Sequence, residues 1–288
     1  MQKRPIALIT GTSSGFGMNA SVALVKAGFY VIASMRDLEK RGPLDKIANL
    51  HLASEHMEVI SLDVTRPAEI EQAITSIIER HGRIDLLLNN AGCAYGGFAE
   101  EIPPEHWRSQ FAVNVFGLID VTRAVLPHMR RQQAGRIINL SSISGRFGFP
   151  GLSPYAASKH AVEGFSESLR LEMLPYHVYV SVIEPGSYRT PIWEKALQTQ
   201  QPVPDSDSAY AGQMKLLRQH VESIMRSAPE PDAVISAIVR AATSPAPRFR
   251  YPVGRSTVLM LAAKTLLPWR WIERLVVKKL SPSSHRAD

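Results

Sequence analysis

A tyrosine and a lysine four residues apart are the first candidates for chemistry in this sequence. Tyr155 and Lys159 follow a glycine- and proline-rich bend, in the stretch NLSSISGRFGFPGLSPYAASKHAVEG that spans 139–164. Residues at positions i and i+4 of a helix share one face, so these two side chains can interact. A lysine ammonium beside a phenol favours the phenolate, so it lowers the pKa of the tyrosine from about 10. Taken alone, the spacing is that of an ordinary surface pair, and the rest of the chain decides between the two interpretations.

A glycine-rich segment near the start is the second candidate. TGTSSGFG directly follows a short apolar run and places Gly11, Gly15 and Gly17 where a helix is expected to begin. Glycines at such positions permit a tight turn and let backbone N–H groups approach a pyrophosphate at the helix N-terminus. A tight turn from strand to helix without a ligand is the structural alternative. Because the segment follows the first strand of a β-α-β unit, dinucleotide binding is favoured.

The elements that must position these residues alternate along the chain. Short apolar runs predict strands at 5–10, 29–35, 57–62, 84–90, 135–141, 178–184 and 248–253. Segments with helical periodicity lie at 15–27, 43–54, 67–81, 104–131, 153–174 and 230–243. Strands that are apolar nearly throughout are typical of a sheet covered on both faces. The alternating order therefore predicts an α/β fold with a parallel, doubly wound sheet.

Two segments interrupt this alternation. Residues 187–229 form a long insertion before the last strand, which predicts a lid over a binding site. The tail after Gly254 is a helical candidate interrupted at Pro268. Beyond that proline we expect an apolar stripe (Trp269, Ile272, Val276 and Leu280) and a basic stripe (Arg270, Arg274 and Lys278). Such a basic amphipathic helix suits an anionic membrane surface, and covering the substrate pocket or a partner subunit is the alternative.

Composition limits the compartment and the class of partner. The chain has 288 residues, 45% of them hydrophobic, which is enough for a substantial core. Its one cysteine, Cys93, excludes an intramolecular disulfide framework and fits a reducing compartment. MQKRPIALITG predicts a first strand rather than a signal peptide, and no apolar run approaches the roughly 20 residues that span a bilayer. We therefore expect a cytoplasmic protein, with membrane-peripheral attachment as the alternative, and no metal site.

The net charge of +7 is concentrated at the end of the chain, where the residues from Lys264 onward contribute +4 of it. The sequence contains no recognised nucleic-acid-binding motif, and the apolar content of the tail argues against a nucleic-acid arm. We therefore expect no nucleic-acid partner.

Several motifs together resemble the short-chain dehydrogenase/reductase family over roughly 5–254. They are T-G-x-x-x-G-x-G, the NNAG of 89–92 and Y-x-x-x-K, and SSGFG, ASMRDL, YAASKHAVEGFSESLRLE and VIEPG are most similar to its hydroxysteroid and retinol dehydrogenase branch. The resemblance implies a single-domain Rossmann-type fold of about seven strands over 1–254, with a helical lid and a C-terminal helical extension over 255–288. It also implies a nicotinamide cofactor and a homodimer or homotetramer.

The resemblance implies four catalytic residues as well. Tyr155 would give a proton to the substrate oxygen in reduction and accept one in oxidation, while Lys159 would lower the pKa of the phenol and bind the nicotinamide ribose. Ser142, thirteen positions before the tyrosine, would donate a hydrogen bond to the substrate oxygen. Asn114 would order a water that relays the proton. Asparagine is a poor residue for a helix interior, so its place within 104–131 favours a special role.

The end of the second expected strand bears on the choice of cofactor. NAD-binding members of the family usually carry an acidic residue there, whereas this chain has SMRD, with Arg36 before Asp37. An arginine can make a bidentate, charge-assisted contact with a 2′-phosphate, which favours NADP over NAD. Ser14 argues the other way, because many NADP-dependent relatives place a basic residue at that point of the glycine loop.

The remaining cofactor contacts follow from the family motifs. Asp63, which ends the third strand, matches an adenine-contacting aspartate, and a simple strand-end cap is the equally weighted alternative. The motif P-G-x-x-x-T implies a contact with the nicotinamide carboxamide. The full expected cofactor-binding set is Gly11, Ser13, Ser14, Gly15, Phe16, Gly17, Arg36, Asp63, Val64, Asn90, Ala91, Gly92, Tyr155, Lys159, Pro185, Gly186 and Thr190.

The lid indicates the kind of substrate. Its apolar side chains suit a lipophilic molecule, or they pack the lid onto the body: Tyr188, Ile192, Trp193, Leu197, Tyr210, Met214 and Leu217. The expected function is NADP-dependent interconversion of an alcohol and a ketone or aldehyde, with a steroid-, retinoid- or lipid-like substrate. A 3-oxoacyl-thioester reductase is the alternative within enzymes. A cofactor-binding regulator without chemistry is the alternative of another class, and the intact set of four residues argues against it.

Overall fold

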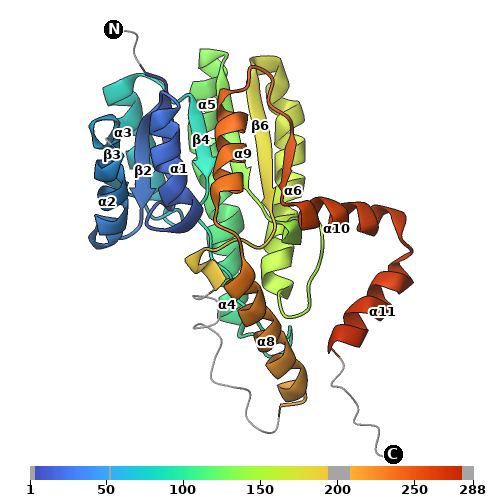
Figure 1. Cartoon of the computed structure of the whole chain (residues 1–288). Coiled ribbons are helices and arrows are strands. Elements are labelled where there is room, and N and C mark those ends of the chain that lie inside the picture. Colours follow the sequence, from blue (N-terminus) through green and yellow to red (C-terminus); the bar gives the residue numbers. More distant parts are fainter. Residues whose placement is uncertain (1–3, 52, 194–207, 281–288) are drawn as a thin grey trace, which may run out of the picture.

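A computed structural model describes residues 4–51, 53–193 and 208–280 (Figure 1). Its strands are β1 (Ile6–Thr10), β2 (Tyr30–Met35), β3 (Met57–Ser61), β4 (Leu86–Asn89), β5 (Gly135–Leu140), β6 (Val178–Pro185) and β7 (Arg250–Val253). They form one sheet in the order β3-β2-β1-β4-β5-β6-β7, and every neighbouring pair is parallel. The predicted doubly wound α/β fold is therefore confirmed.

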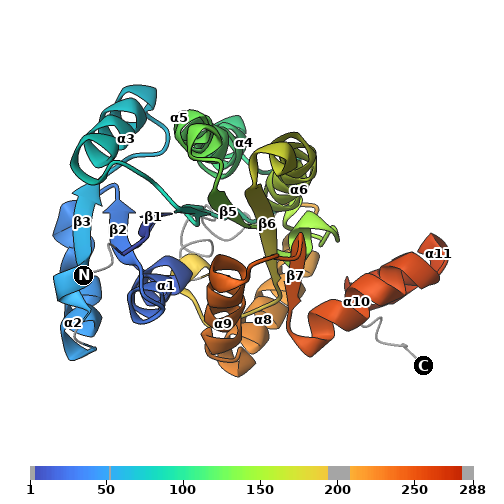
Figure 2. The same cartoon turned by 90° about the horizontal axis from the view of Figure 1, so that it is seen from above.

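Helices cover both faces of this sheet and make three layers (Figure 2). On one face lie α1 (Gly15–Lys26), α2 (Gly42–Leu50) and α9 (Asp232–Thr243), and on the other lie α3 (Pro67–His81), α5 (Leu118–Gln132) and α6 (Ser153–Met173). Each face has its own apolar core, one including Leu24, Leu88 and Ile238 and the other including Ile74 and Val125. Burial on both faces explains why the strands are apolar throughout.

The prediction of one continuous α-helix over 104–131 is wrong in one respect. The structure has α4 (Pro104–Phe111), then a π-helical segment over Ala112–Gly117, then α5. A π-helical turn adds a residue to the helical repeat and is frequent at functional sites. Asn114 lies within it, and apolar periodicity did not reveal it. The helix expected at 43–54 is also shorter than predicted: α2 ends at Leu50.

The lid insertion and the tail after Gly254, which interrupt the alternation of strands and helices, both contain helices. The lid contains α8 (Ala211–Ser227), while Leu197 lies outside the described residues. The tail forms α10 (Arg255–Leu266) and α11 (Trp269–Leu280), which extend away from the β7 side of the body (Figures 1 and 2). Within the described part of the chain, no helix has the length and apolar character needed to cross a bilayer.

Candidate active site

A cavity of about 500 Å³ lies at the carboxyl ends of the central strands. It is lined by residues that follow β1, β2, β4, β5 and β6, including Gly11, Arg36, Gly92, Ser142 and Gly186. The order of the sheet reverses between β1 and β4, and ligands of doubly wound sheets bind at such a switch point. Every residue of the expected cofactor and catalytic sets lines the cavity except Gly17 and Asn114.

The glycine loop is shaped so that backbone can approach backbone. Gly11 has φ +73°, and a Cβ added to it would lie 2.7 Å from Cα of Ala91. A Cβ on Gly17 would lie 2.3 Å from Nδ2 of Asn90, which itself donates hydrogen bonds to the carbonyls of Thr10 and Gly11, both at 2.8 Å. Gly17 therefore acts by close packing rather than by lining the cavity.

The end of α1 that faces this cavity suits an anion. Its first turn contains no acidic residue, so the partial positive charge of the helix N-terminus is not neutralised. The loop of Ser13, Ser14 and Gly15 that precedes it lines the cavity. These residues fit the pyrophosphate of a dinucleotide cofactor.

The two charged residues after β2 differ in their surroundings. Both line the cavity, and Arg36 is exposed. The carboxylate of Asp37 accepts from the backbone N–H of Glu39 at 3.0 Å and pairs with Lys40 at 2.8 Å, so it caps the following turn. The hydrogen bond from Lys40 is the main cause that lowers the pKa of Asp37. The carboxylate of Asp37 therefore bonds to residues that follow it closely in the sequence.

Asp63 makes the expected cap at a position on the cavity wall. It lines the cavity, and its Oδ1 accepts hydrogen bonds from the backbone N–H and the hydroxyl of Thr65, at 2.9 and 2.8 Å. The carboxylate thus caps the turn before α3 from a position at the cavity wall. The geometry is compatible with a contact to the adenine as well as with a cap.

Tyr155 lies near the start of α6 and is 5% exposed. Lys159 is one turn further on and equally buried, with its Nζ 5.8 Å from the centroid of the Tyr155 ring. That Nζ donates a hydrogen bond to the carbonyl of Leu140, at the end of β5, at 2.7 Å. The structure therefore brings the pair together inside the cavity, and the alternative of a surface pair is wrong.

The pKa of Tyr155 lies above its usual value. Burial raises it to about 12, and a hydrogen bond from Ser142 opposes this only in part. Burial also lowers the pKa of Lys159 to about 8. Removal from water is therefore the main influence on this phenol, and the lowering of its pKa by Lys159 that the family resemblance implies stays a prediction. Tyr155 is held in its protonated form, which is the form that donates a proton.

Ser142 lies two residues after the end of β5, and its hydroxyl makes different contacts from that of Ser141. Its hydroxyl is hydrogen-bonded to Tyr155 and accepts from the backbone N–H of Ser144 at 3.1 Å. The hydroxyl of Ser141 lies instead against Gly145, where an added Cβ would be 2.5 Å away. Ser142 is thus the serine that reaches the tyrosine.

Asn114 supports the site from behind the cavity wall. It is 1% exposed, accepts from the backbone N–H of Cys93 at 2.9 Å, and donates to the carbonyl of Cys93 at 3.0 Å and to the hydroxyl of Ser158 at 3.2 Å. Its side chain therefore joins the π-helical turn to α6 and to the loop after β4.

Sequence reasoning missed a second residue with the same task. Gln110 is fully buried, donates to the carbonyl of Cys93 at 2.5 Å and accepts from the backbone N–H of Tyr95 at 2.9 Å. Together with Asn114 it fixes the loop that follows NNAG. A glutamine four positions before the asparagine is the only available signal, and it has meaning only once the loop is in place.

The wall beside Tyr155 is apolar. Ala94, Leu152, Ile192 and Trp193 pack around its ring, and Trp193 makes an edge contact with a centroid separation of 5.9 Å. Ile192 and Trp193 are lid residues that were expected to face a lipophilic substrate. Leu152 and Ala94 were not anticipated, because they come from loops whose approach depends on the tertiary fold.

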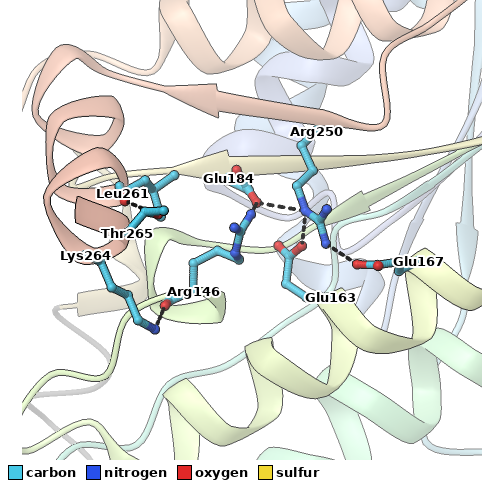
Figure 3. A network of polar contacts seen from close by, with 8 residues as sticks. All are labelled: Arg146, Glu163, Glu167, Glu184, Arg250, Leu261, Lys264 and Thr265. Carbon is cyan, nitrogen blue, oxygen red and sulfur yellow. Dashed lines mark hydrogen bonds and ion pairs between the residues drawn. The ribbon is translucent and has the colours of Figure 1, made fainter. Parts of the chain in front are cut away.

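An ionic network holds the loop between Ser142 and Tyr155, which we call the catalytic loop, to its neighbours (Figure 3). Arg250 of β7 binds Glu163 of α6 at 3.1 Å and Glu184 of β6 at 3.5 Å. Arg146, four residues after Ser142, binds the same Glu184 carboxylate at 3.2 Å, and its carbonyl accepts from Lys264 of α10. Glu184 is 1% exposed, and burial is the main cause that raises its pKa to about 7. The network thus connects the sheet, α6, the loop after Ser142 and the tail.

The comparisons with known proteins agree with this site. The family model for short chain dehydrogenases matches residues 5–201. An uncharacterized oxidoreductase, YusZ of Bacillus subtilis, is 46% identical over 281 residues, which cover 96% of this chain and 99% of the relative. The 3-ketodihydrosphingosine reductase of Bacteroides thetaiotaomicron is 35% identical over 91% of this chain and 93% of its own. A solved short-chain dehydrogenase from Streptomyces avermitilis is 31% identical, covers 95% of this chain and 98% of its own, and has a TM-score of 0.79.

The chain belongs to the short-chain dehydrogenase/reductase family. It is an NAD(P)-dependent oxidoreductase that acts on CH–OH groups. The comparisons do not single out the hydroxysteroid and retinol dehydrogenase branch. In the described part of the chain, no group of three or more potential ligand side chains is arranged to hold a metal ion.

Proposed function

We propose that the protein is an NADP-dependent oxidoreductase that interconverts a lipid ketone and its alcohol. The observation that carries this proposal is the convergence of Ser142, Tyr155 and Lys159 on one cavity whose wall beside the tyrosine is apolar. The pocket therefore combines acid–base groups with alkyl and indole side chains.

The chemistry follows from the residues. A bound nicotinamide supplies or accepts the hydride. Tyr155, protonated because of burial, donates its proton to the substrate oxygen in reduction and accepts one in oxidation. Ser142, which already hydrogen-bonds the tyrosine, donates a hydrogen bond to that oxygen. Lys159 binds the nicotinamide ribose, and Asn114 orders the water that relays the proton to Tyr155.

Two features support NADP as the cofactor. Arg36 lines the cavity and is exposed, and the neighbouring carboxylate of Asp37 is paired with Lys40 at the same wall. A guanidinium at this position matches a 2′-phosphate. The contacts of Gly92, Asp63 and Pro185–Thr190 with the cofactor are part of the same proposal, because these residues line the same cavity.

The substrate class rests on the apolar wall and on one relative. The relative from Bacteroides thetaiotaomicron is named for reduction of 3-ketodihydrosphingosine, a lipid ketone. Ile192 and Trp193 provide apolar surface next to Tyr155 for such a molecule. We also propose a cytoplasmic homo-oligomer, a dehydrogenase domain over 1–254 with the lid inserted, and peripheral membrane contact through the extension over 255–288.

The test is turnover with purified protein. We expect consumption of NADPH with 3-ketodihydrosphingosine, followed by nicotinamide absorbance, and weaker turnover with steroids, retinoids and 3-oxoacyl thioesters. Tyr155→Phe keeps the ring but removes the transferable proton, so turnover falls at least about 100-fold while NADPH still binds. A Phe variant with near-normal turnover contradicts the assignment of Tyr155. Faster turnover of the thioester than of the lipid ketone contradicts the substrate class alone.

A further inference from the structure

The tail exposes an unusual amount of apolar surface. Among the described side chains of α10, α11 and the turn between them, eight large apolar ones are between 38% and 79% exposed: Val258, Leu259, Leu266, Leu267, Trp269, Trp271, Leu275 and Val277. Exposed apolar side chains that are scattered singly need no explanation, but a concentration on two consecutive helices marks a surface that contacts something else.

The inward side of these helices is already in use. Ile272 of α11 is 7% exposed and packs against Ile143 and Phe147 of the loop after Ser142, together with Val276 and Leu261. Two residues of the stripe expected to face a membrane, Ile272 and Val276, therefore cover the catalytic loop instead, whereas Trp269 stays 53% exposed. Trp271 and Leu275 lie on a different side of α11 and remain exposed. The tail is thus docked through one face and leaves a second apolar face uncovered.

The positive charge of α10 and α11 indicates what kind of surface they contact. Residues 255–280 contain six lysines and arginines and a single acidic residue, Glu273. Arg270 and Arg274 are exposed beside the exposed tryptophans and leucines. Basic residues attract anionic lipid headgroups, and tryptophan favours the boundary between headgroups and acyl chains. A bilayer with anionic lipids matches both features at once.

We propose that α10 and α11 form a membrane-docking arm, which lies on an anionic bilayer through Trp271, Leu275 and the basic residues beside them. Because the arm is packed on the loop between Ser142 and Tyr155, docking holds the active site at the membrane surface. This placement gives the pocket access to a lipid ketone from the bilayer. That last step rests on the proposed reduction of a lipid ketone, whereas membrane docking itself does not.

Vesicle binding tests the arm without any cofactor or substrate. The full chain is mixed with large unilamellar vesicles of phosphatidylcholine alone or with phosphatidylglycerol, at low salt, and sedimented. We expect binding to the anionic vesicles only, with a blue shift of the tryptophan fluorescence. Trp271→Glu with Leu275→Glu should abolish sedimentation. Arg270→Glu with Arg274→Glu should weaken the partition coefficient at least about 30-fold.

Matched controls separate the arm from general effects of charge and polarity. Leu50→Glu with Leu171→Glu alters two side chains that are 75% and 69% exposed on the body, and Lys46→Glu with Arg123→Glu changes the net charge by the same amount as the arm variant. Both controls should bind vesicles like the unaltered protein.

Three results would overturn the proposal. The first is unaltered protein that stays in the supernatant with anionic vesicles at low salt. The second is a control variant that loses binding as fully as the arm variants. The third is an oligomer in vesicle-free solution that dissociates when Trp271 and Leu275 are changed, because the uncovered face would then bind a second copy. Failure of ketone reduction leaves vesicle binding unchanged, so the two proposals fail separately.

Discussion

At the scale of single residues, burial controls the chemistry of the site. The pKa of Tyr155 rises to about 12 and that of Lys159 falls to about 8, and desolvation is the main cause of both shifts. Each shift favours the neutral form of its side chain. The tyrosine is thereby kept protonated, and the lysine loses its proton more readily than an exposed lysine does.

The proposed preference for NADP depends on one residue. Arg36→Ala should weaken NADPH binding about 10- to 150-fold, because a hydrogen bond to a charged group contributes roughly 1.5–3 kcal/mol. NADH carries no phosphate at that position, so its affinity should hardly change. Titration of wild type and variant by protein fluorescence measures both affinities.

A nearby arginine provides the control for this change. Arg41 pairs with Asp45 at 2.7 Å outside the cavity, so Arg41→Ala should leave both affinities as they are. Equal losses for NADPH and NADH in the Arg36 variant would mean that the guanidinium does not bind the 2′-phosphate. A wild type that prefers NADH would overturn the NADP proposal.

At the scale of elements, the site depends on contacts between segments that are distant in sequence. The π-helical turn brings Asn114 to the loop after β4, and Arg146 binds a carboxylate of β6 that Arg250 of β7 also contacts. Leu217 of α8 lies against Gly151, where an added Cβ would be 2.1 Å away, so lid and catalytic loop are packed together. These contacts fix the positions of the elements that surround the cavity.

The buried carboxylate of Glu184 should make stability depend on pH. Its pKa is raised from 4.5 to about 7, so the folded state binds more protons than the unfolded state between these values. The free energy of unfolding of wild type should therefore fall, relative to that of Glu184→Gln, as the pH rises from 4.5 through 7. The upper limit is about 3 kcal/mol, at 1.36 kcal/mol per pKa unit.

Urea unfolding of both proteins at about pH 5, near the lower end of this window, and at about pH 8, above its upper end, gives that difference. The exposed Glu167 is the control, because its pKa is lowered by Arg250 and it stays ionised at both values. A difference between wild type and Glu184→Gln that does not change with pH would mean that Glu184 is ionised throughout.

At the scale of the whole molecule, the tail is coupled to the cofactor cavity. Thr257 of α10 is 1% exposed and lies against Gly186, where an added Cβ would be 2.5 Å from its hydroxyl. The domain boundary that we propose at Gly254 therefore separates two segments that share a contact at the cavity wall.

Two truncations should distinguish the parts of the tail. A chain that ends after Leu267 loses Ile272 from its contact with Phe147, which costs roughly 1.5–3 kcal/mol and lowers Tm by several degrees, while NADPH still binds. A chain that ends after Gly254 also loses Thr257, so it should bind NADPH more weakly. Calorimetry and NADPH titration measure these effects. Equal affinities for both truncated chains and the full chain would exclude α10 from the site.

Much of this arrangement was predictable because the signals are local. Each strand was predicted to within two residues at each end, since a buried parallel strand is an uninterrupted apolar run. Motif spacing likewise predicted the pairing of Tyr155 with Lys159. The π-helical turn, Gln110 and the docked face of α11 were not predictable, because each depends on a partner that only the tertiary fold supplies. The raised pKa of Tyr155 belongs to the same group, since spacing contains no information about burial.

The parallel order of the sheet has a consequence for the way the chain folds. No two neighbouring strands are joined by a hairpin, and β1 pairs with β4, whose first residue is 80 positions after Ile6. Contacts of such long range form slowly, because a large loop must close before the pairing stabilises it. During synthesis, however, the first 89 residues already contain four adjacent strands. We expect this half, which contains the glycine loop, to assemble first. The strand before Ser142, β5, and the strand that contains Glu184, β6, would then be added to an existing edge.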